Sequence, residues 1–480
     1  MPLPDLIEIV PLDKPVQAEI TVPGSKSITN RALILAALTD GETVLQGALW
    51  SEDTQVMVEA LRRLGFAVKV EQDLQEFCNR TITVKGLGGG IPTAGTAEKP
   101  LELFVGNAGT AARFLAALVC LGQGVYRLHG VARMHERPQA ALFQALRELG
   151  YRIDSPNDRL PTVIHGCGPL AGACRVSIAE SSQFASALLL SSRRGNWRVE
   201  ITGANQNEQP YVDMTLSLLR AFPANGGSVQ IEPDASSGSY FFGAARLLQA
   251  AEVAAALSTA IAEEDTAPGK KSMAAARLEC AEVSTISVRQ WPVSGWQIDA
   301  DFRELFFGQA PAPGRQPGGT ILSPHGVFLS LPNEISRDHH LGDSIMTAAV
   351  LAPFLGQIIR LTDLGRLRVQ ESERVVGLRT ELTKCGAEVV EQGDTLTIFP
   401  SAKKLHGAEI ETYNDHRMAM CFAILGLKVP GIKIKNPSCV KKTFPNFFQK
   451  LAAPSPHGLG AEIRDGKTGK RLAVEELFAN

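Results

Sequence analysis

A lysine, a serine and an arginine gather where one apolar stretch of this chain begins. Lys26 and Ser27 follow the turn sequence Pro23-Gly24-Ser25, and Arg31 lies about one helical turn later. The first N–H groups of a helix are unpaired and carry partial positive charge, so such a helix start can bind an anion. The segment is not a P-loop, because no glycine stands at the required offset before Lys26. Two interpretations stay open: a Ser-capped Pro-Gly turn and an anion site.

Five other apolar stretches begin with a similar polar cluster. Ser, Thr, Asn and Asp are typical of helix starts because their side chains accept hydrogen bonds from first-turn N–H groups. The clusters contain Asn107, Gly109 and Thr110; Ser181, Ser182 and Gln183; the serines of 236–239; Asp343 and Ser344; and Asp415, His416 and Arg417. The stretches behind them are apolar nearly all round, so we expect buried helices. For each cluster alone, a capped core helix and an anion-binding helix start both stay open.

Two arginine-rich segments, Arg133–Pro138 and Arg368–Arg374, place arginines beside carboxylates. A solvated turn and surface ion pairs at a helix start are the ordinary interpretations of such segments. Several cationic helix starts in one chain, however, favour a pocket for polyanions, because folding alone gives little reason to build them.

The composition is that of an ordinary globular protein. The chain has 480 residues, of which 44% are apolar and 20% charged, and its net charge is −2. This excludes a strongly basic nucleic-acid binder and favours two or three domains.

The eight cysteines are scattered without zinc-ligand spacing, which indicates a reduced, cytoplasmic protein without a metal. We expect neither a signal peptide nor a membrane span, since no apolar run approaches about 20 residues.

Short alternating or β-branched stretches predict strands between the helices. Examples are Glu19–Val22, Thr81–Val84 and Thr395–Ile398. The chain is therefore expected to be α/β or α+β. In the first half the helix starts lie roughly 55 to 80 residues apart, which suggests one repeated βαβ-type unit.

Eight motifs occur in order along the chain. They are Pro23-Gly24-Ser25-Lys26-Ser27, Asn107-Ala108-Gly109-Thr110-Ala111, Arg133-Met134-His135-Glu136-Arg137-Pro138, Ser181-Ser182-Gln183-Phe184, Pro210-Tyr211-Val212-Asp213, Asp234-Ala235-Ser236-Ser237, Tyr413-Asn414-Asp415-His416-Arg417-Met418-Ala419-Met420 and Lys442-Thr443-Phe444-Pro445. Together they closely resemble the 5-enolpyruvylshikimate-3-phosphate synthase family of enolpyruvyl transferases. The resemblance covers about residues 20–245 and 340–448, and we place none in about 250–335.

The resemblance implies two similar domains, each of three βαβαββ units with buried parallel helices, and an active site in the interdomain cleft. We expect residues 1–23 with 236–480 to form the first domain, with a divergent segment at about 250–335, and residues 24–235 to form the second. The implied reaction moves the enolpyruvyl group of phosphoenolpyruvate to the 5-hydroxyl of shikimate 3-phosphate and releases phosphate, in aromatic amino acid biosynthesis. The expected partners are these two small molecules, without cofactor, nucleic acid or membrane, and we expect a monomer.

The resemblance also implies a role for each matching residue. Asp343 would take the proton of the attacking hydroxyl, and Glu371 would protonate the methylene carbon. Shikimate 3-phosphate is expected on Lys26, Ser27, Arg31, Ser181, Ser182, Gln183, Tyr211 and Asp343. Phosphoenolpyruvate is expected on Lys26, Asn107, Gly109, Thr110, Arg137, Gln183, Arg374, His416, Arg417 and Lys442. No metal is implied, because Arg and Lys meet the charge of the leaving phosphate.

Three residues depart from the family pattern. Glu208 stands where a serine commonly lies two residues before Pro-Tyr. A carboxylate ~4 Å from a phosphate would cost on the order of 4 kcal/mol per charge pair at an effective dielectric constant near 20, so Glu208 must turn away or binding is altered. Gln370 replaces the usual lysine before Glu371, and Phe114 replaces a common proline, from which we expect altered glyphosate sensitivity.

Two alternative functions stay open at this point. The related UDP-N-acetylglucosamine enolpyruvyl transferase uses a loop cysteine, and Arg133–Pro138 contains none. A non-catalytic or altered-specificity phosphometabolite-binding relative is favoured by Glu208 and Gln370. A phosphate-release assay with both substrates separates these hypotheses.

Overall fold

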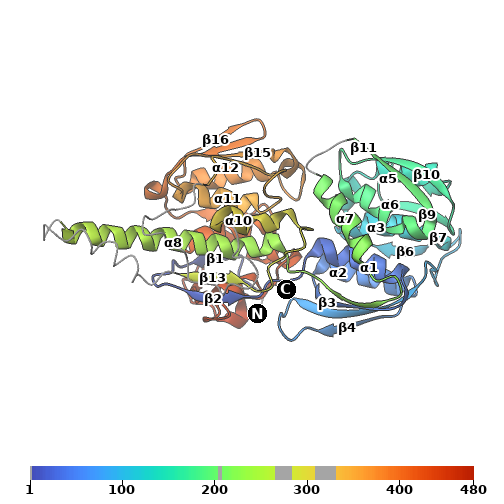
Figure 1. Cartoon of the computed structure of the whole chain (residues 1–480), viewed down its shortest axis with the longest axis horizontal. Coiled ribbons are helices and arrows are strands. Elements are labelled where there is room, and N and C mark those ends of the chain that lie inside the picture. Colours follow the sequence, from blue (N-terminus) through green and yellow to red (C-terminus); the bar gives the residue numbers. More distant parts are fainter. Residues whose placement is uncertain (1–2, 204–207, 265–283, 309–330, 480) are drawn as a thin grey trace. The chain divides into compact units, whose positions relative to one another are not determined.

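A computed structural model describes residues 3–203, 208–264, 284–308 and 331–479, with backbone alone for 250–264. The described residues form two compact units (Figure 1). The first unit comprises the chain up to Val22 together with Ala235–Trp291 and everything from Ile298 onward. The second unit comprises Pro23–Asp234 and the short segment Pro292–Gln297. Within the expected divergent segment, residues 265–283 and 309–330 lie outside the described residues.

One segment lies elsewhere than the sequence prediction placed it. Pro292–Gln297 was assigned to the first domain, but it packs with the second unit. The reason is visible in its contacts, since Trp296 lies against the core of the second unit and Gln297 Nε2 donates to the Pro233 carbonyl at 2.9 Å.

The second unit contains two four-stranded sheets and one parallel pair of strands among its described residues. The first sheet has the order β12-β3-β5-β4, with bounds Gly227–Gln230, Asp40–Leu49, Asn79–Leu87 and Val68–Gln72. The second has the order β6-β7-β9-β8, with bounds Leu101–Phe104, Gln123–His129, Thr162–Cys167 and Arg152–Asp154. The pair consists of β10 and β11, with bounds Gly172–Ser177 and Trp197–Thr202.

The described part of the first unit repeats this arrangement. One sheet has the order β14-β15-β17-β16, with bounds Glu334–Ser336, Ile359–Thr362, Thr395–Ile398 and Val389–Gln392. The other has the order β18-β19-β1-β20, with bounds Glu409–Ile410, Ile432–Lys435, Leu6–Ile9 and Ile463–Asp465. The parallel pair consists of β2 and β13, with bounds Gln17–Ile20 and Thr285–Val288.

All four of these sheets share one pairing pattern, a parallel pair followed by two antiparallel pairs. Parallel neighbours need a crossover, and in three of the sheets, at β6–β7, β14–β15 and β18–β19, a buried helix lies in it. Helix α3 (Gly109–Val119) connects β6 to β7, and α11 (Ile345–Leu351) lies between β14 and β15. The predicted α/β class and repeated βαβ-type unit are therefore confirmed.

The second unit has seven helices among its described residues, and several of them pack together at its centre with strands around them (Figure 1). Besides α3 they are α1 (Lys26–Leu38), α2 (Glu52–Arg63), α4 (Ala132–Glu136), α5 (Ala140–Glu148), α6 (Ser182–Gly195) and α7 (Gln209–Ala221). Helix α1 contacts α3, α6 and α7, and every residue of α1 from Ile28 onward is buried. The sequences of α1 and α3 are apolar nearly all round, and such helices are stable only inside a core, whereas α2 and α5 bury one face each.

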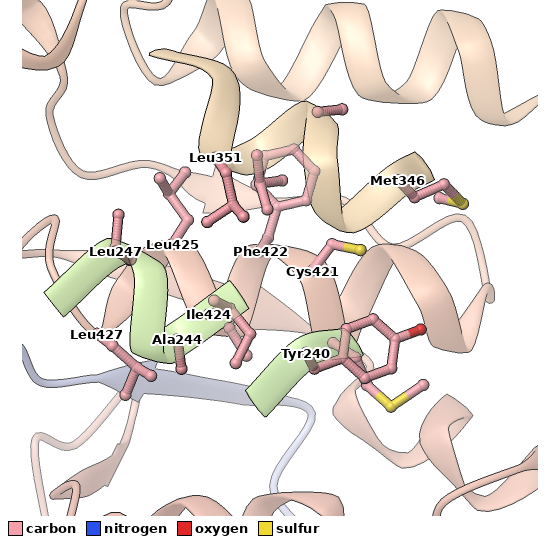
Figure 2. Close-up of a cluster of buried hydrophobic side chains, with 14 of the residues drawn as sticks. Tyr240, Ala244, Leu247, Met346, Leu351, Cys421, Phe422, Ile424, Leu425 and Leu427 are labelled. Atoms are coloured by element: carbon pink, nitrogen blue, oxygen red, sulfur yellow. The ribbon is translucent and has the colours of Figure 1, made fainter. Parts of the chain in front are cut away.

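The first unit is built around α8 (Ala235–Glu264), α11 and α13 (His416–Gly426). Its other helices are α10 (Asp301–Phe307), α12 (Arg374–Lys384) and α14 (Phe447–Ala452), and its short 3₁₀ segments are η1 (Ile298–Ala300), η2 (Ala352–Phe354), η3 (Leu364–Val369), η4 (Ala402–Lys404), η5 (Pro437–Lys442) and η6 (Val474–Leu477). Figure 2 shows Tyr240, Met346 and Phe422 among the apolar side chains that join α8, α11 and α13. Within the described ranges, no helix has the length and apolarity that a membrane crossing requires.

The six predicted helix starts are confirmed, but their polar residues seldom cap. The helices begin at Lys26, Gly109, Ser182, Ala235, Ile345 and His416. Ser181 accepts a hydrogen bond from the Gln183 N–H at 3.3 Å, and Asp415 accepts one from the Arg417 N–H at 2.9 Å. The N-cap residues of α1, α3 and α11, which are Ser25, Ala108 and Ser344, make no side-chain cap hydrogen bond. The capping interpretation is wrong for these three helices.

Candidate active site

Two arginines converge on the start of α3 in the second unit. Arg137 donates to the Asn107 carbonyl at 3.2 Å, and Arg113 donates to Gln183 Oε1 at 3.0 Å. A Cβ atom on Gly109 would lie 2.4 Å from Arg113 Nη1 and 2.6 Å from Arg137 Nη2. Only glycine therefore lets both guanidinium groups cover the backbone, and the arrangement offers positive charge beside first-turn amides.

The starts of α3 and α6 are linked by these contacts. Gln183 lies in the first turn of α6, and Arg113 also stacks over Phe184, with its guanidinium carbon 5.4 Å from the ring centroid. Every residue of α3 is buried except Thr110, which lies in the first turn and is partly exposed. The Asn107 Oδ1 atom is buried without a hydrogen-bond partner among the described residues. The predicted residues Asn107, Gly109, Arg137 and Gln183 thus belong to one cluster.

Lys26 and Arg31 lie at the start of α1 and both contact protein groups. Lys26 Nζ lies 3.1 Å from Asp53 Oδ2. Arg31 is 2% exposed and donates to Thr215 Oγ1 at 2.7 Å, to the Ser27 carbonyl at 2.9 Å and to Ser186 Oγ at 3.1 Å. Burial lowers the pKa of Arg31 to about 10, which still leaves it charged at neutral pH. Arg31 therefore joins α1 to α6 and α7 while it keeps a positive charge in the core.

Glu208 does not turn away from the start of α6. Its Oε2 atom accepts a hydrogen bond from the Ser182 N–H at 2.5 Å, and the residue is 4% exposed. Tyr211, the other predicted residue of α7, lies one turn later, and its carbonyl accepts from Arg31 at 3.3 Å. The expectation that Glu208 turns away is wrong, because its carboxylate binds an amide at the start of α6. The alternative expectation, altered substrate binding, stays a prediction.

Asp343 is the centre of a second cluster, in the first unit. Its Oδ2 lies 3.1 Å from Arg417 Nε and 3.6 Å from Arg374 Nη1, and its Oδ1 accepts from Arg337 at 3.1 Å. Burial alone would raise the pKa of Asp343, but the three guanidinium groups outweigh it and hold the pKa well below the ordinary value. Asp343 is therefore an ionised carboxylate that three guanidinium groups stabilise.

Arg374 connects Asp343 to the second predicted catalytic carboxylate. This arginine is 1% exposed, and its Nη2 lies 2.9 Å from Glu371 Oε2. Lys442 Nζ lies 2.8 Å from the other oxygen of Glu371. Gln370, which replaces the expected lysine, accepts a hydrogen bond from Arg374. Glu371 is thus held between two cations at the start of α12.

Asp415 fixes Arg374 in place. It is fully buried, its two oxygens accept from Arg374 at 2.7 and 3.2 Å, and Ser372 Oγ donates to it at 2.9 Å. Burial alone would raise the pKa of Asp415, but the charge and the hydrogen bonds of Arg374 outweigh this effect and lower it. His416, expected to bind phosphoenolpyruvate, is 2% exposed, and burial lowers its pKa well below the ordinary value, so its imidazole is neutral.

Sequence reasoning missed three residues of this cluster. Arg337 is 2% exposed and binds Asp343, but it lies in no recognisable motif. Asp299 accepts from Ser236 Oγ at 2.8 Å and from the Ser344 N–H at 2.6 Å, which anchors the residue after Asp343. Asp415 lies in the motif that ends in Met420, two residues before Arg417, but the motif gives no indication of its ion-pair partner Arg374.

The sequence of this chain matches one family model. The model describes EPSP synthase (3-phosphoshikimate 1-carboxyvinyltransferase) and matches residues 11–256 and 336–451. The chain belongs to this EPSP synthase family. Among curated relatives, a 3-phosphoshikimate 1-carboxyvinyltransferase of Opitutus terrae is 38% identical over 94% of this chain and 98% of its own length. One from a Sulfurovum species is 35% identical over 92% and 97%.

Two solved structures of named enolpyruvyl transferases share this fold. An EPSP synthase from Acinetobacter baumannii has a TM-score of 0.69 at 21% identity, covering 95% of this chain and 99% of its own. The enolpyruvyl transferase NikO from Streptomyces tendae has a TM-score of 0.61 at 16% identity, covering 97% and 99%. These likenesses confirm the expected two-domain α/β class.

Proposed function

We propose that this chain carries out the reaction of its family. It transfers the enolpyruvyl group of phosphoenolpyruvate to the 5-hydroxyl of shikimate 3-phosphate and releases inorganic phosphate. The observation that carries the proposal is the network of Asp343, Glu371, Arg374, Arg417 and Lys442, in which the two carboxylates share the buried cation Arg374 and each contacts one further cation. Neither alternative, the UDP-N-acetylglucosamine enzyme nor a non-catalytic relative, is favoured by the family model or the curated relatives.

The charges of the substrates suit both clusters. Each substrate carries one carboxylate and one phosphate of about −1.5 to −2, so the pair brings about −5 to −6. The cations of the two clusters are Lys26, Arg31, Arg113, Arg137, Arg337, Arg374, Arg417 and Lys442. Several of them contact carboxylates of the protein, and bound substrate anions would compete for these contacts. We propose that both clusters act on the same pair of substrates.

Asp343 is the proposed base for the 5-hydroxyl. With Arg337, Arg374 and Arg417 around it, the carboxylate is stabilised and weakly basic. When Arg374 and Arg417 neutralise the phosphate and carboxylate of phosphoenolpyruvate, their effect on Asp343 falls and its basicity rises. Substrate binding thus prepares the base for the step in which it is needed.

Glu371 is the proposed acid for the methylene carbon. Its two oxygens contact Arg374 and Lys442, the cations proposed to hold phosphoenolpyruvate. Once these cations carry the substrate's anionic groups, protonation of Glu371 costs less, and the proton can pass to the carbon. As phosphate leaves, its charge is met by the same Arg and Lys side chains.

The remaining assignments follow the motifs. For shikimate 3-phosphate we propose Lys26, Ser27, Arg31, Ser181, Ser182, Gln183, Tyr211 and Asp343; for phosphoenolpyruvate we propose Lys26, Asn107, Gly109, Thr110, Arg137, Gln183, Arg374, His416, Arg417 and Lys442. We further propose that the two compact units are the two domains of the family and that the protein acts as a cytoplasmic monomer. The unpaired cysteines among the described residues, such as Cys120 and Cys421, support a reducing location.

A phosphate-release assay tests the proposed function. The wild-type protein is expected to release phosphate only when both phosphoenolpyruvate and shikimate 3-phosphate are present. Asp343→Ala and Glu371→Ala should each lose most of this turnover, whereas Asp394→Ala, an exposed carboxylate on the first unit, should retain it. Full turnover in both Asp343→Ala and Glu371→Ala would overturn the catalytic assignment, and binding without turnover in the wild type would favour a sensor.

A further inference from the structure

Glu208 brings a carboxylate to the helix start that the proposed function assigns to shikimate 3-phosphate. The residue lies at the N-cap position of α7, and its side chain reaches the first turn of α6. Its Oε2 atom accepts from the Ser182 N–H at 2.5 Å while the residue is 4% exposed. A side chain of this chain therefore occupies an amide that could otherwise bind an anion of the substrate.

The surroundings of this carboxylate favour negative charge. The start of a helix carries partial positive charge, and Ser181 Oγ already accepts from the Gln183 N–H, so Glu208 and Ser181 share the first-turn amides. The buried guanidinium of Arg31 interacts favourably with Glu208. An anion is thus favoured at the start of α6, and in this chain the carboxylate of Glu208 is that anion.

We propose that Glu208 is a specificity-determining residue that competes with the 3-phosphate of the acceptor for the start of α6. The inference rests on the proposed function. Two anions cannot both accept from the Ser182 N–H, and a carboxylate close to a phosphate is repelled. Glu208 therefore lowers the affinity for the phosphorylated acceptor, and its side chain moves aside when that acceptor binds.

The backbone around Glu208 allows this movement to be confined to the side chain. The Glu208 carbonyl accepts from the Tyr211 N–H at 3.2 Å, which holds the residue at the start of α7. The flexible glutamate side chain can rotate away from Ser182 without a change in this hydrogen bond. Gly109 and Arg137, proposed for phosphoenolpyruvate, lie together at the start of α3, whereas Glu208 binds the start of α6. The affinity for phosphoenolpyruvate should therefore depend little on Glu208.

Two substitutions separate charge from shape at this position. Glu208→Ser removes the carboxylate and most of the side chain, and Glu208→Gln keeps the volume and an acceptor oxygen but removes the charge. The matched control is Glu200→Ser, which removes an exposed carboxylate from β11 of the same unit. Thermal unfolding of each variant, compared with the wild type, identifies any variant that does not fold.

The measurement is the dissociation constant of shikimate 3-phosphate by titration calorimetry, together with the KM of each substrate. Glu208→Ser should bind shikimate 3-phosphate about tenfold more tightly or better, and Glu208→Gln should gain in the same direction. The KM of phosphoenolpyruvate should stay within about twofold in both variants, and Glu200→Ser should behave as the wild type. If Glu208→Ser does not fold, the result for Glu208→Gln decides.

Two outcomes would overturn the inference. One is unchanged or weaker binding of shikimate 3-phosphate in the folded Glu208 variants. The other is a gain in affinity in Glu208→Ser that is equally large for unphosphorylated shikimate, because Glu208 would then not act through the 3-phosphate. Failure of the proposed function is distinguishable, since the wild type would then release no phosphate with either acceptor.

Discussion

Replacement of Asp415 by asparagine should destabilise the first unit strongly. Asp415 is fully buried, and its two oxygens accept from Arg374 at 2.7 and 3.2 Å, while Arg374 itself is 1% exposed. Asparagine keeps the volume and an acceptor for the Arg417 N–H, so the change removes the charge and leaves the helix cap. Removing one partner of a buried ion pair costs about 3–5 kcal/mol, because the other charge stays buried.

We expect the lower end of this range. Arg374 keeps Glu371 at 2.9 Å and Asp343 at 3.6 Å, so part of its charge stays compensated. A loss of about 3 kcal/mol corresponds to a melting temperature about 6–12 °C lower for a domain of this size. The assay is urea unfolding at pH 7 followed by circular dichroism, with thermal unfolding beside it.

The pH dependence gives the same prediction a second readout. The pKa of Asp415 is lowered in the folded protein, because the charge and the hydrogen bonds of Arg374 outweigh the effect of burial. A carboxyl with a lowered pKa contributes stability above its unfolded value of about 4, and loses it as the pH falls through the folded value. The difference between the wild type and Asp415→Asn should therefore be full above about pH 5 and shrink below about pH 4.

An exposed ion pair provides the control. Asp394 contacts Arg368 at 2.9 Å, but its side chain is 58% exposed, so Asp394→Asn should cost only about 0–1 kcal/mol. The reasoning would be refuted if Asp415→Asn lost no more stability than Asp394→Asn.

Three further substitutions test the proposed roles. Gly109→Ala places a Cβ 2.6 Å from Arg137 Nη2, so it should raise the KM of phosphoenolpyruvate about tenfold with little loss of stability; an unchanged KM would contradict the site. Arg337→Gln removes a cation 3.1 Å from Asp343, so the pKa of Asp343 should rise and the acidic limb of the kcat/KM profile should move to higher pH. Glu371→Gln cannot supply a proton, so kcat should fall about 10²- to 10⁴-fold with KM nearly unchanged; a normal kcat would exclude it as the acid.

The fold could be predicted from the sequence to a large extent. Each core helix is apolar nearly all round and follows a polar cluster, so its existence and its first residue could be identified from pattern alone. The motifs then indicated the family, which the family model confirms, and candidate site residues on α3, α6 and α13. What local patterns could not give was the partner of each polar group, since Ser25 and Ser344 make no side-chain cap hydrogen bond.

The ion pairs of the site were beyond the sequence for the same reason. Arg337 lies in no motif, and although Asp343 follows six residues later, only the folded loop between β14 and α11 brings the two side chains together. Glu208 was recognised as a departure, but the sequence offered no way to decide between a carboxylate that turns away and one that binds the start of α6. Both cases depend on which element packs beside the residue, and no short-range periodicity records this.

A crystal structure of Glu371→Gln with shikimate 3-phosphate and phosphoenolpyruvate tests the central claim most directly, because this variant should bind both substrates without turnover. The account predicts that shikimate 3-phosphate contacts Ser182 and Lys26 with Glu208 displaced, and that phosphoenolpyruvate contacts Arg137 of the second unit together with Arg374 or Arg417 of the first. Phosphoenolpyruvate bound to the cations of one unit alone would contradict the claim that the two clusters act on the same pair of substrates.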